Sequence, residues 1–115
     1  MNVTRDDIGT DRFDLALDLL AEGRSFALSG VSFFLEEPDV VRCNAWTDWQ
    51  PENLDETRAQ HEIVRAQEAF SLLSNRSPRF ASLVQGRSPR YSVGYDYGTG
   101  GVELYYLSGD KLMKS

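Results

Sequence analysis

Residues 25–46 read SFALSGVSFFLEEPDVVRCNAW, and this stretch decides the fold class. Apolar and aromatic residues fill most of it, and the turn-forming run Glu36-Glu37-Pro38-Asp39 interrupts them. We therefore expect one strand on each side of that turn. The segment 31–35 is too uniformly apolar to show a period, so around Ser29-Gly30 the pattern fits either a buried strand or a short helix.

An amphipathic helix is expected before this stretch, at about residues 10–22. Its apolar side carries Phe13, Ala16, Leu17 and Leu20, and its opposite side carries Asp11, Asp14, Asp18 and Glu22. Thr10 suits the N-cap, and Gly23 stands where a left-handed residue commonly ends a helix.

A second, longer helix is expected after it. Asn53 followed by Glu56 resembles a capping box, and one apolar face then recurs at helical spacing through Ala59, Ile63, Ala66, Phe70 and Leu73. The turn-rich residues 75–90 form a connector that leaves room for a short helix near 79–85.

The last third of the chain predicts a β-hairpin. Tyr91, Val93, Tyr95 and Tyr97 alternate with small or polar residues, and the alternation resumes at Val102, Leu104 and Tyr106 after a glycine-rich turn at 98–101. A further turn at 108–110 precedes a short edge strand at 111–114, whose lysines discourage pairing with other molecules.

This order predicts a single α+β domain over residues 1–115. We expect an antiparallel sheet of about four to five strands with two main helices packed on one face, in the order α-β-β-α-β-β with a possible short last strand.

Composition narrows the class of protein. The chain has 115 residues and one cysteine, Cys43, so it forms no internal disulfide and no multi-cysteine zinc site. We see no signal peptide and no apolar run long enough to span a membrane, and we expect a cytoplasmic protein without a cofactor.

The net charge of −6 is unevenly distributed. Residues 1–68 carry fifteen acids and six arginines, whereas residues 69–115 carry three acids, four arginines and two lysines. An acidic protein repels nucleic acid and favours basic partners. The short basic segment with Arg76, Arg79, Arg87 and Arg90 is therefore expected to pair with the acidic half or with an acidic partner.

The sequence offers little catalytic equipment. His61 is the only histidine, and it falls between arginines on the polar side of the long helix. Strand alternation puts the side chain of Cys43 on the same side as Val41 and Ala45, which predicts a buried, inert thiol. The glycines at 98–101 precede a strand rather than a helix, so they predict a hairpin turn and not a phosphate loop. We assign no catalytic or metal-binding residue.

Two functions from different classes remain open. The first is a non-enzymatic binding protein, such as an inhibitor or immunity protein, that engages a basic toxin, nuclease or defence enzyme. Its expected contact residues are acids and two tryptophans: Asp11, Asp14, Asp18, Glu22, Glu36, Glu37, Asp39, Trp46, Asp48 and Trp49. The second is a ligand-binding or enzymatic domain with a pocket lined by Tyr91, Tyr95, Tyr97 and Tyr106.

Overall fold

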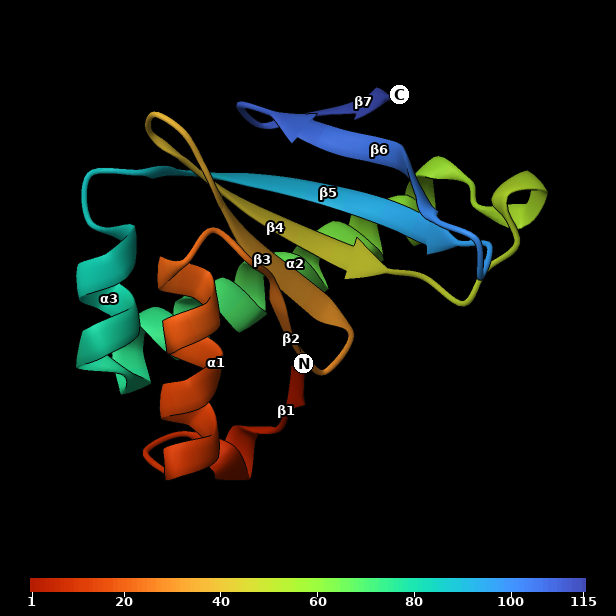
Figure 1. Cartoon of the computed structure of the whole chain (residues 1–115). Helices are drawn as coiled ribbons and strands as arrows, with labels where there is room; N and C mark the ends of the chain where they lie inside the picture. The colour runs from red at the N-terminus through yellow and green to blue at the C-terminus, as the bar shows by residue number, and fades with distance from the viewer.

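A seven-stranded mixed sheet, with helices on one of its faces, forms the protein in the computed structural model, which describes residues 1–115 (Figure 1). The strands are neighbours in the order of the chain: β1 (Asn2–Val3), β2 (Phe26–Leu28), β3 (Val31–Glu36), β4 (Val40–Trp46), β5 (Ser88–Asp96), β6 (Gly101–Ser108) and β7 (Lys111–Lys114). The helices are α1 (Asp11–Ala21), α2 (Glu56–Arg76) and α3 (Pro78–Val84), with short 3₁₀ turns at Arg5–Asp7 and Pro51–Asn53.

The prediction of an antiparallel sheet of four to five strands is wrong. β4 and β5 run parallel, from the pair Val40 and Ser88 to the pair Trp46 and Gly94, and β1 runs parallel to β2. The physical reason lies in α2 and α3, because this helical connection carries the chain back to the end of the sheet where β4 begins. Strands in sequence therefore become parallel neighbours, and the sheet is mixed.

The ambiguous segment around Ser29 contains a tight turn that adds a strand. Ser29 and Gly30 both have positive φ, 50° and 78°, and they join β2 to β3 as a two-residue hairpin. Residues 31–35 are therefore strand and not helix. This hairpin, together with β1, raises the strand number above the expected one.

The helices begin at side-chain caps. Thr10 caps α1 as expected, and Ser77 caps α3, in which Pro78 takes the first position. The expected cap of the long helix is wrong, because Asp55 and not Asn53 accepts from the backbone N–H of Arg58. Asn53 instead belongs to the 3₁₀ turn that precedes the helix.

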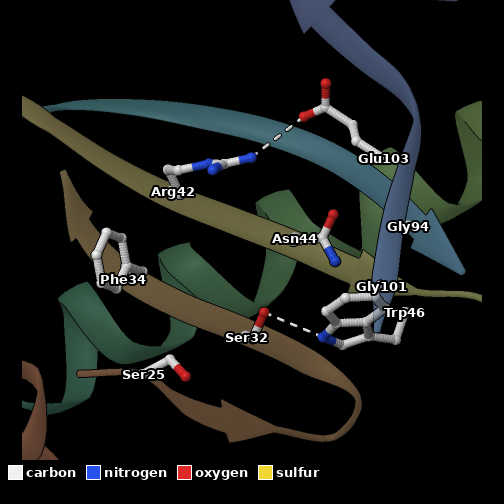
Figure 2. Close-up of a pocket in the computed structure, with 9 residues that line it drawn as sticks. All are labelled: Ser25, Ser32, Phe34, Arg42, Asn44, Trp46, Gly94, Gly101 and Glu103. Atoms are coloured by element: carbon white, nitrogen blue, oxygen red, sulfur yellow. Dashed lines mark hydrogen bonds and ion pairs between the residues drawn. The ribbon is translucent and has the colours of Figure 1, made fainter. Parts of the chain in front are cut away.

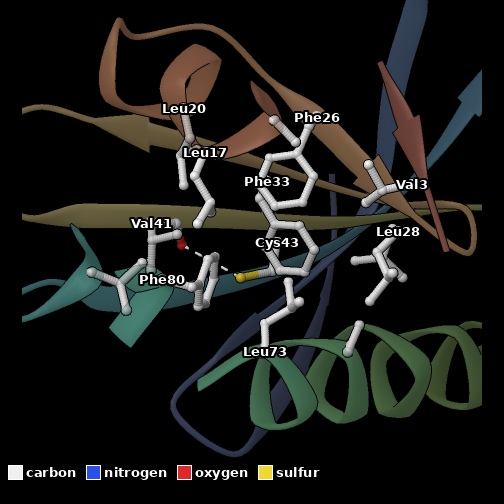
Figure 3. Close-up of a cluster of buried hydrophobic side chains, with 14 of the residues drawn as sticks. Val3, Leu17, Leu20, Phe26, Leu28, Phe33, Val41, Cys43, Leu73 and Phe80 are labelled. Carbon is white, nitrogen blue, oxygen red and sulfur yellow. Dashed lines mark hydrogen bonds between the residues drawn. The ribbon is translucent and has the colours of Figure 1, made fainter. Parts of the chain in front are cut away.

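The core lies between the helices and one face of the sheet (Figure 3). Four fully buried phenylalanines pack there, mostly edge to face: Phe13, Phe26, Phe33 and Phe80. A smaller cluster of Leu54, Ala59, Ile63, Val93 and Tyr105 joins the start of α2 to β5 and β6. None of the helices is both long and apolar enough to cross a bilayer.

A β-bulge in β6 shifts the side-chain alternation. Val93 pairs with Tyr105 and Gly94 pairs with Glu103, so Leu104 is the extra residue. Tyr105 therefore faces the helices and is buried, where its hydroxyl donates to the carbonyl of Leu54 at 3.3 Å. Tyr106 faces the opposite side of the sheet, away from Leu104.

Candidate binding surface around Trp46

The face of the sheet opposite the helices carries a polar hollow of about 310 Å³ (Figure 2). Alternation along β4 sends Val41, Cys43 and Ala45 into the core and Arg42, Asn44 and Trp46 to this open face. Neighbouring strands complete the hollow with Ser32, Phe34, Gly94, Gly101 and Glu103, and Ser25 lies at its edge.

Trp46 lies across the sheet in this hollow. Its indole Nε1 donates to the Oγ of Ser32 on β3 at 3.1 Å. The other end of the ring system lies over two glycines, where a β-carbon on Gly94 would come within 3.0 Å of Cζ3 and one on Gly101 closer still. Glycine at both positions therefore leaves the space that the indole fills.

A charged cluster forms the far wall of the hollow. Glu103 accepts from Arg90 through both carboxylate oxygens, from Arg42 at 3.4 Å and from the Ser115 hydroxyl at 2.9 Å. Burial alone would raise the pKa of Glu103, but the hydrogen bonds from Arg90 and Ser115 and the two positive charges outweigh it and lower that pKa. The guanidinium of Arg90 also lies 4.8 Å from the ring centre of Tyr106.

Asn44 leaves one donor unused in this hollow. Its Oδ1 accepts from the buried Ser92 hydroxyl at 2.8 Å, whereas its buried Nδ2 has no hydrogen-bond partner. A buried donor without an acceptor costs free energy.

A second hollow, of about 400 Å³, lies beyond the end of β4 and shares Trp46 with the first. The rest of its lining consists of Thr47, Asp48, Trp49, Glu62, Arg65 and the Ser29-Gly30 turn. The two hollows therefore have Trp46 in common, one on the open face of the sheet and the other beyond the carboxyl end of β4.

Arg65 holds this second hollow together. Its guanidinium donates to the carbonyl oxygens of Ser29 at 2.8 Å and Trp46 at 2.6 Å, and to the Glu62 carboxylate at 3.1 Å. One side chain of α2 thus fixes the β2–β3 turn and the end of β4. A β-carbon on Gly30 would approach Nη1 of Arg65 to 2.9 Å, so glycine gives the guanidinium its room.

The tryptophan loop, residues 46–55, contains three acids and no basic residue. Asp48, Trp49 and Glu52 are exposed, with Trp49 44% accessible. Arg58 from the first turn of α2 covers Trp49, with its guanidinium carbon 3.9 Å from the ring centre. Because β4 and β5 are parallel, Asp96 at the end of β5 lies at this same end of the sheet.

The acidic candidates from the sequence divide into paired and unpaired carboxylates. Four of them form ion pairs within the chain: Asp14 and Asp18 with Arg79, Glu36 with Arg42, and Glu37 with Arg87. Four form none: Asp11, Glu22, Asp39 and Asp48. The basic segment thus meets the acidic half through Arg79 and Arg87, whereas Arg90 pairs with Glu103 of its own half and Arg76 pairs with no acid.

The structure does not bring the ten candidate residues into one surface. Glu36, Glu37 and Asp39 lie at the opposite end of β4 from the tryptophans, about 20 Å away for a seven-residue strand. The acidic side of α1 lies near α3, whereas the tryptophan loop precedes α2 at the other end of the sheet (Figure 1). Only Trp46, Asp48 and Trp49 line a common hollow.

The tyrosines named for the alternative site are separated as well. Tyr91 faces the helices and packs against Phe70, where burial raises its pKa to about 12. Tyr95 and Tyr97 contact each other near the β5–β6 turn, and Tyr106 lies on the open face. None of the four hollows at the surface is lined by a tyrosine.

The residues weighed for catalysis lie apart from one another. Cys43 is in the core, where burial raises the pKa of its thiol to about 12. His61 is exposed on α2, on the side that faces Leu112. No three His, Cys, Asp or Glu side chains come together as metal ligands would.

Sequence reasoning missed Arg65, Glu62, Asn44 and the two glycines under Trp46. Helical spacing puts Arg65 on the polar side of α2, and spacing alone does not show that the β2–β3 turn lies against that side. Gly94 carried a usable signal, since a glycine inside a strand often marks a close approach by another group.

No protein-family model, curated protein or solved structure matches this chain.

Proposed function

We propose that this chain is a non-enzymatic protein-binding module, of the inhibitor or immunity type, that engages a basic partner through the tryptophan loop. The observation that carries the proposal is the composition of that loop. Trp49 is exposed among acids that include Asp48 and Glu52, and residues 43–57 contain no lysine or arginine. Aromatic anchors with charges around them are typical of protein interfaces.

The distribution of unpaired charge supports a basic partner. Ten of the eighteen acids form no ion pair within the chain, against five of the twelve basic residues. Asp48, Glu52 and Glu56 are among those ten acids, and they follow one another along the start of α2 and the loop before it. An unpaired, exposed carboxylate attracts a basic surface and accelerates its encounter.

The ion pairs between α1 and Arg79 change which acids support the proposal. Arg79 offsets Asp14 and Asp18, so this side of α1 attracts a basic protein less than its sequence indicates. Asp11 and Glu22 stay unpaired at the two ends of the helix and add to the long-range field.

The test compares two charge reversals in one binding assay. Tagged protein retrieves the basic partner from the native lysate at low salt, and mass spectrometry identifies it. We expect the Asp48→Lys, Glu52→Lys variant to lower the association rate about tenfold or more, and the Asp14→Lys, Asp18→Lys variant to lower it less. Equal rates for the first variant and the unchanged protein would contradict the proposal.

One observation favours a small-ligand function. It concerns a site on the open face of the sheet rather than the tyrosines. The unpaired Nδ2 of Asn44 adjoins a hollow that the indole of Trp46 closes on one side. A metabolite that bound there would raise the melting temperature of the protein. That rise in melting temperature would disappear in Asn44→Leu and persist in Tyr95→Phe. Loss of the rise in both variants would indicate that the ligand contacts the tyrosines.

A further inference from the structure

We infer that the hollow at the end of β4 is a guanidinium site that receives one arginine side chain of the partner. The inference rests on the proposed function for the identity of the partner, but the site itself can be tested without that partner. Its volume of about 400 Å³ lies at the lower end of the range for ligand sites. It accommodates one long side chain and not a folded element.

The chemistry of the lining favours a cation. Asp48 makes no ion pair, and one oxygen of the Glu62 carboxylate accepts from Arg65 while the other has no hydrogen-bond partner. Arg65 is the one basic residue in the lining, and its guanidinium is already engaged by the carbonyls of Ser29 and Trp46. Two carboxylates against one arginine leave the hollow with a net negative charge.

The aromatic lining favours a guanidinium over a small cation. The guanidinium of Arg58 already lies over the ring of Trp49, which shows that this ring accepts such a group. Trp49 lines the hollow, whereas Arg58 does not. A planar guanidinium there would contact an indole and hydrogen-bond to a carboxylate at once, which an ammonium group does less well.

The hollow is also fixed in shape before any partner arrives. Arg65 joins its two walls, and the Thr47 hydroxyl accepts from the backbone N–H of Trp49 at 3.1 Å. A preformed site loses little conformational freedom on binding, so a single arginine side chain gains affinity there.

The experiment titrates the protein with Nα-acetyl-arginine methylamide and follows the backbone and indole N–H signals by NMR. The citrulline analogue, which has the same shape and no charge, is the matched control ligand. We expect saturable shifts at Asp48, Trp49 and Glu62, with a Kd on the order of 10 mM to 100 mM, because one exposed ion pair and one cation–π contact provide the affinity. Citrulline should produce little shift at these residues.

Binding measurements on variants test whether the arginine ligand occupies this hollow. Asp48→Asn and Trp49→Leu should each weaken arginine binding about fivefold or more, and Glu52→Gln should not, because Glu52 belongs to the same loop but does not line the hollow. No shift with arginine, or equal shifts with citrulline, would overturn the inference and leave the proposed function standing. Arginine binding by a protein that retrieves no basic partner would uphold the site and remove the proposed function.

Discussion

The indole of Trp46 lies directly over Gly101, in the space that a β-carbon at position 101 would fill. The two residues are on β4 and β6, with β5 between them. Because the indole also contacts Gly94 and Ser32, the position of this one ring determines the shape of the hollow on the open face.

Replacing Gly101 with alanine should destabilise the protein by about 1–3 kcal/mol, because the methyl group and the indole cannot share that space. In a strand the same change is otherwise neutral or favourable. Urea denaturation measures the free energy of unfolding. In a Trp46→Leu background the penalty should disappear, and a penalty that persists there would show that Trp46 is not its cause.

Protonation of Glu103 should make the protein less stable in acid. Its folded-state pKa is lowered by Arg90, Ser115 and Arg42, so its contribution to stability is present above the unfolded pKa, about 4.3, and is lost as pH falls through the folded pKa. The stability difference between the unchanged protein and Glu103→Gln should therefore be largest near neutral pH and should shrink as the pH falls below the folded-state pKa.

Urea titrations at several pH values measure that difference. Glu22→Gln is the matched control, because Glu22 is an exposed glutamate without an ion pair, and it should change stability little at any pH. A constant difference for Glu103→Gln across the acid range would show that its ion pairs do not form in solution.

Replacing Arg65 with lysine should cost about 1–3 kcal/mol, because one ammonium group cannot reach both backbone carbonyls and the Glu62 carboxylate. The change should also alter tryptophan fluorescence, since Arg65 holds the carbonyl of Trp46. Arg76→Lys, at the far end of the same helix and without an ion pair, is the control and should leave both properties unchanged. Equal stability of the two variants would contradict this role for Arg65.

The thiol of Cys43 should be inert in the folded protein. The thiolate is the reactive form, and burial raises the pKa of this thiol to about 12. A thiol reagent such as DTNB at pH 8 should therefore label the native protein only as fast as it unfolds, and label the protein in concentrated urea at once. Rapid labelling without urea would show that the core around Cys43 opens locally.

Helical spacing and turn chemistry were sufficient for most of the local elements. The apolar faces predicted α1 and α2, Thr10 predicted the start of α1, and the Pro38 turn and the glycine-rich turn at 98–101 predicted two hairpins. These features depend on residues within a few positions of one another. The sequence alone therefore specifies these helices and hairpins.

Strand direction and the site were decided by the tertiary structure. β4 and β5 became parallel because α2 and α3 return the chain across the sheet, and the bulge at Leu104 moved Tyr105 into the core in place of Tyr106. Arg65 contacts Ser29, which is 36 positions away in sequence, and Trp46 reaches Gly101 across β5. By itself the sequence determined helices, hairpins and an acidic loop with two tryptophans, because local backbone preferences specify these. Only the packing of distant segments decided which side chains share a hollow, because the residues that line each hollow come from segments far apart in the sequence.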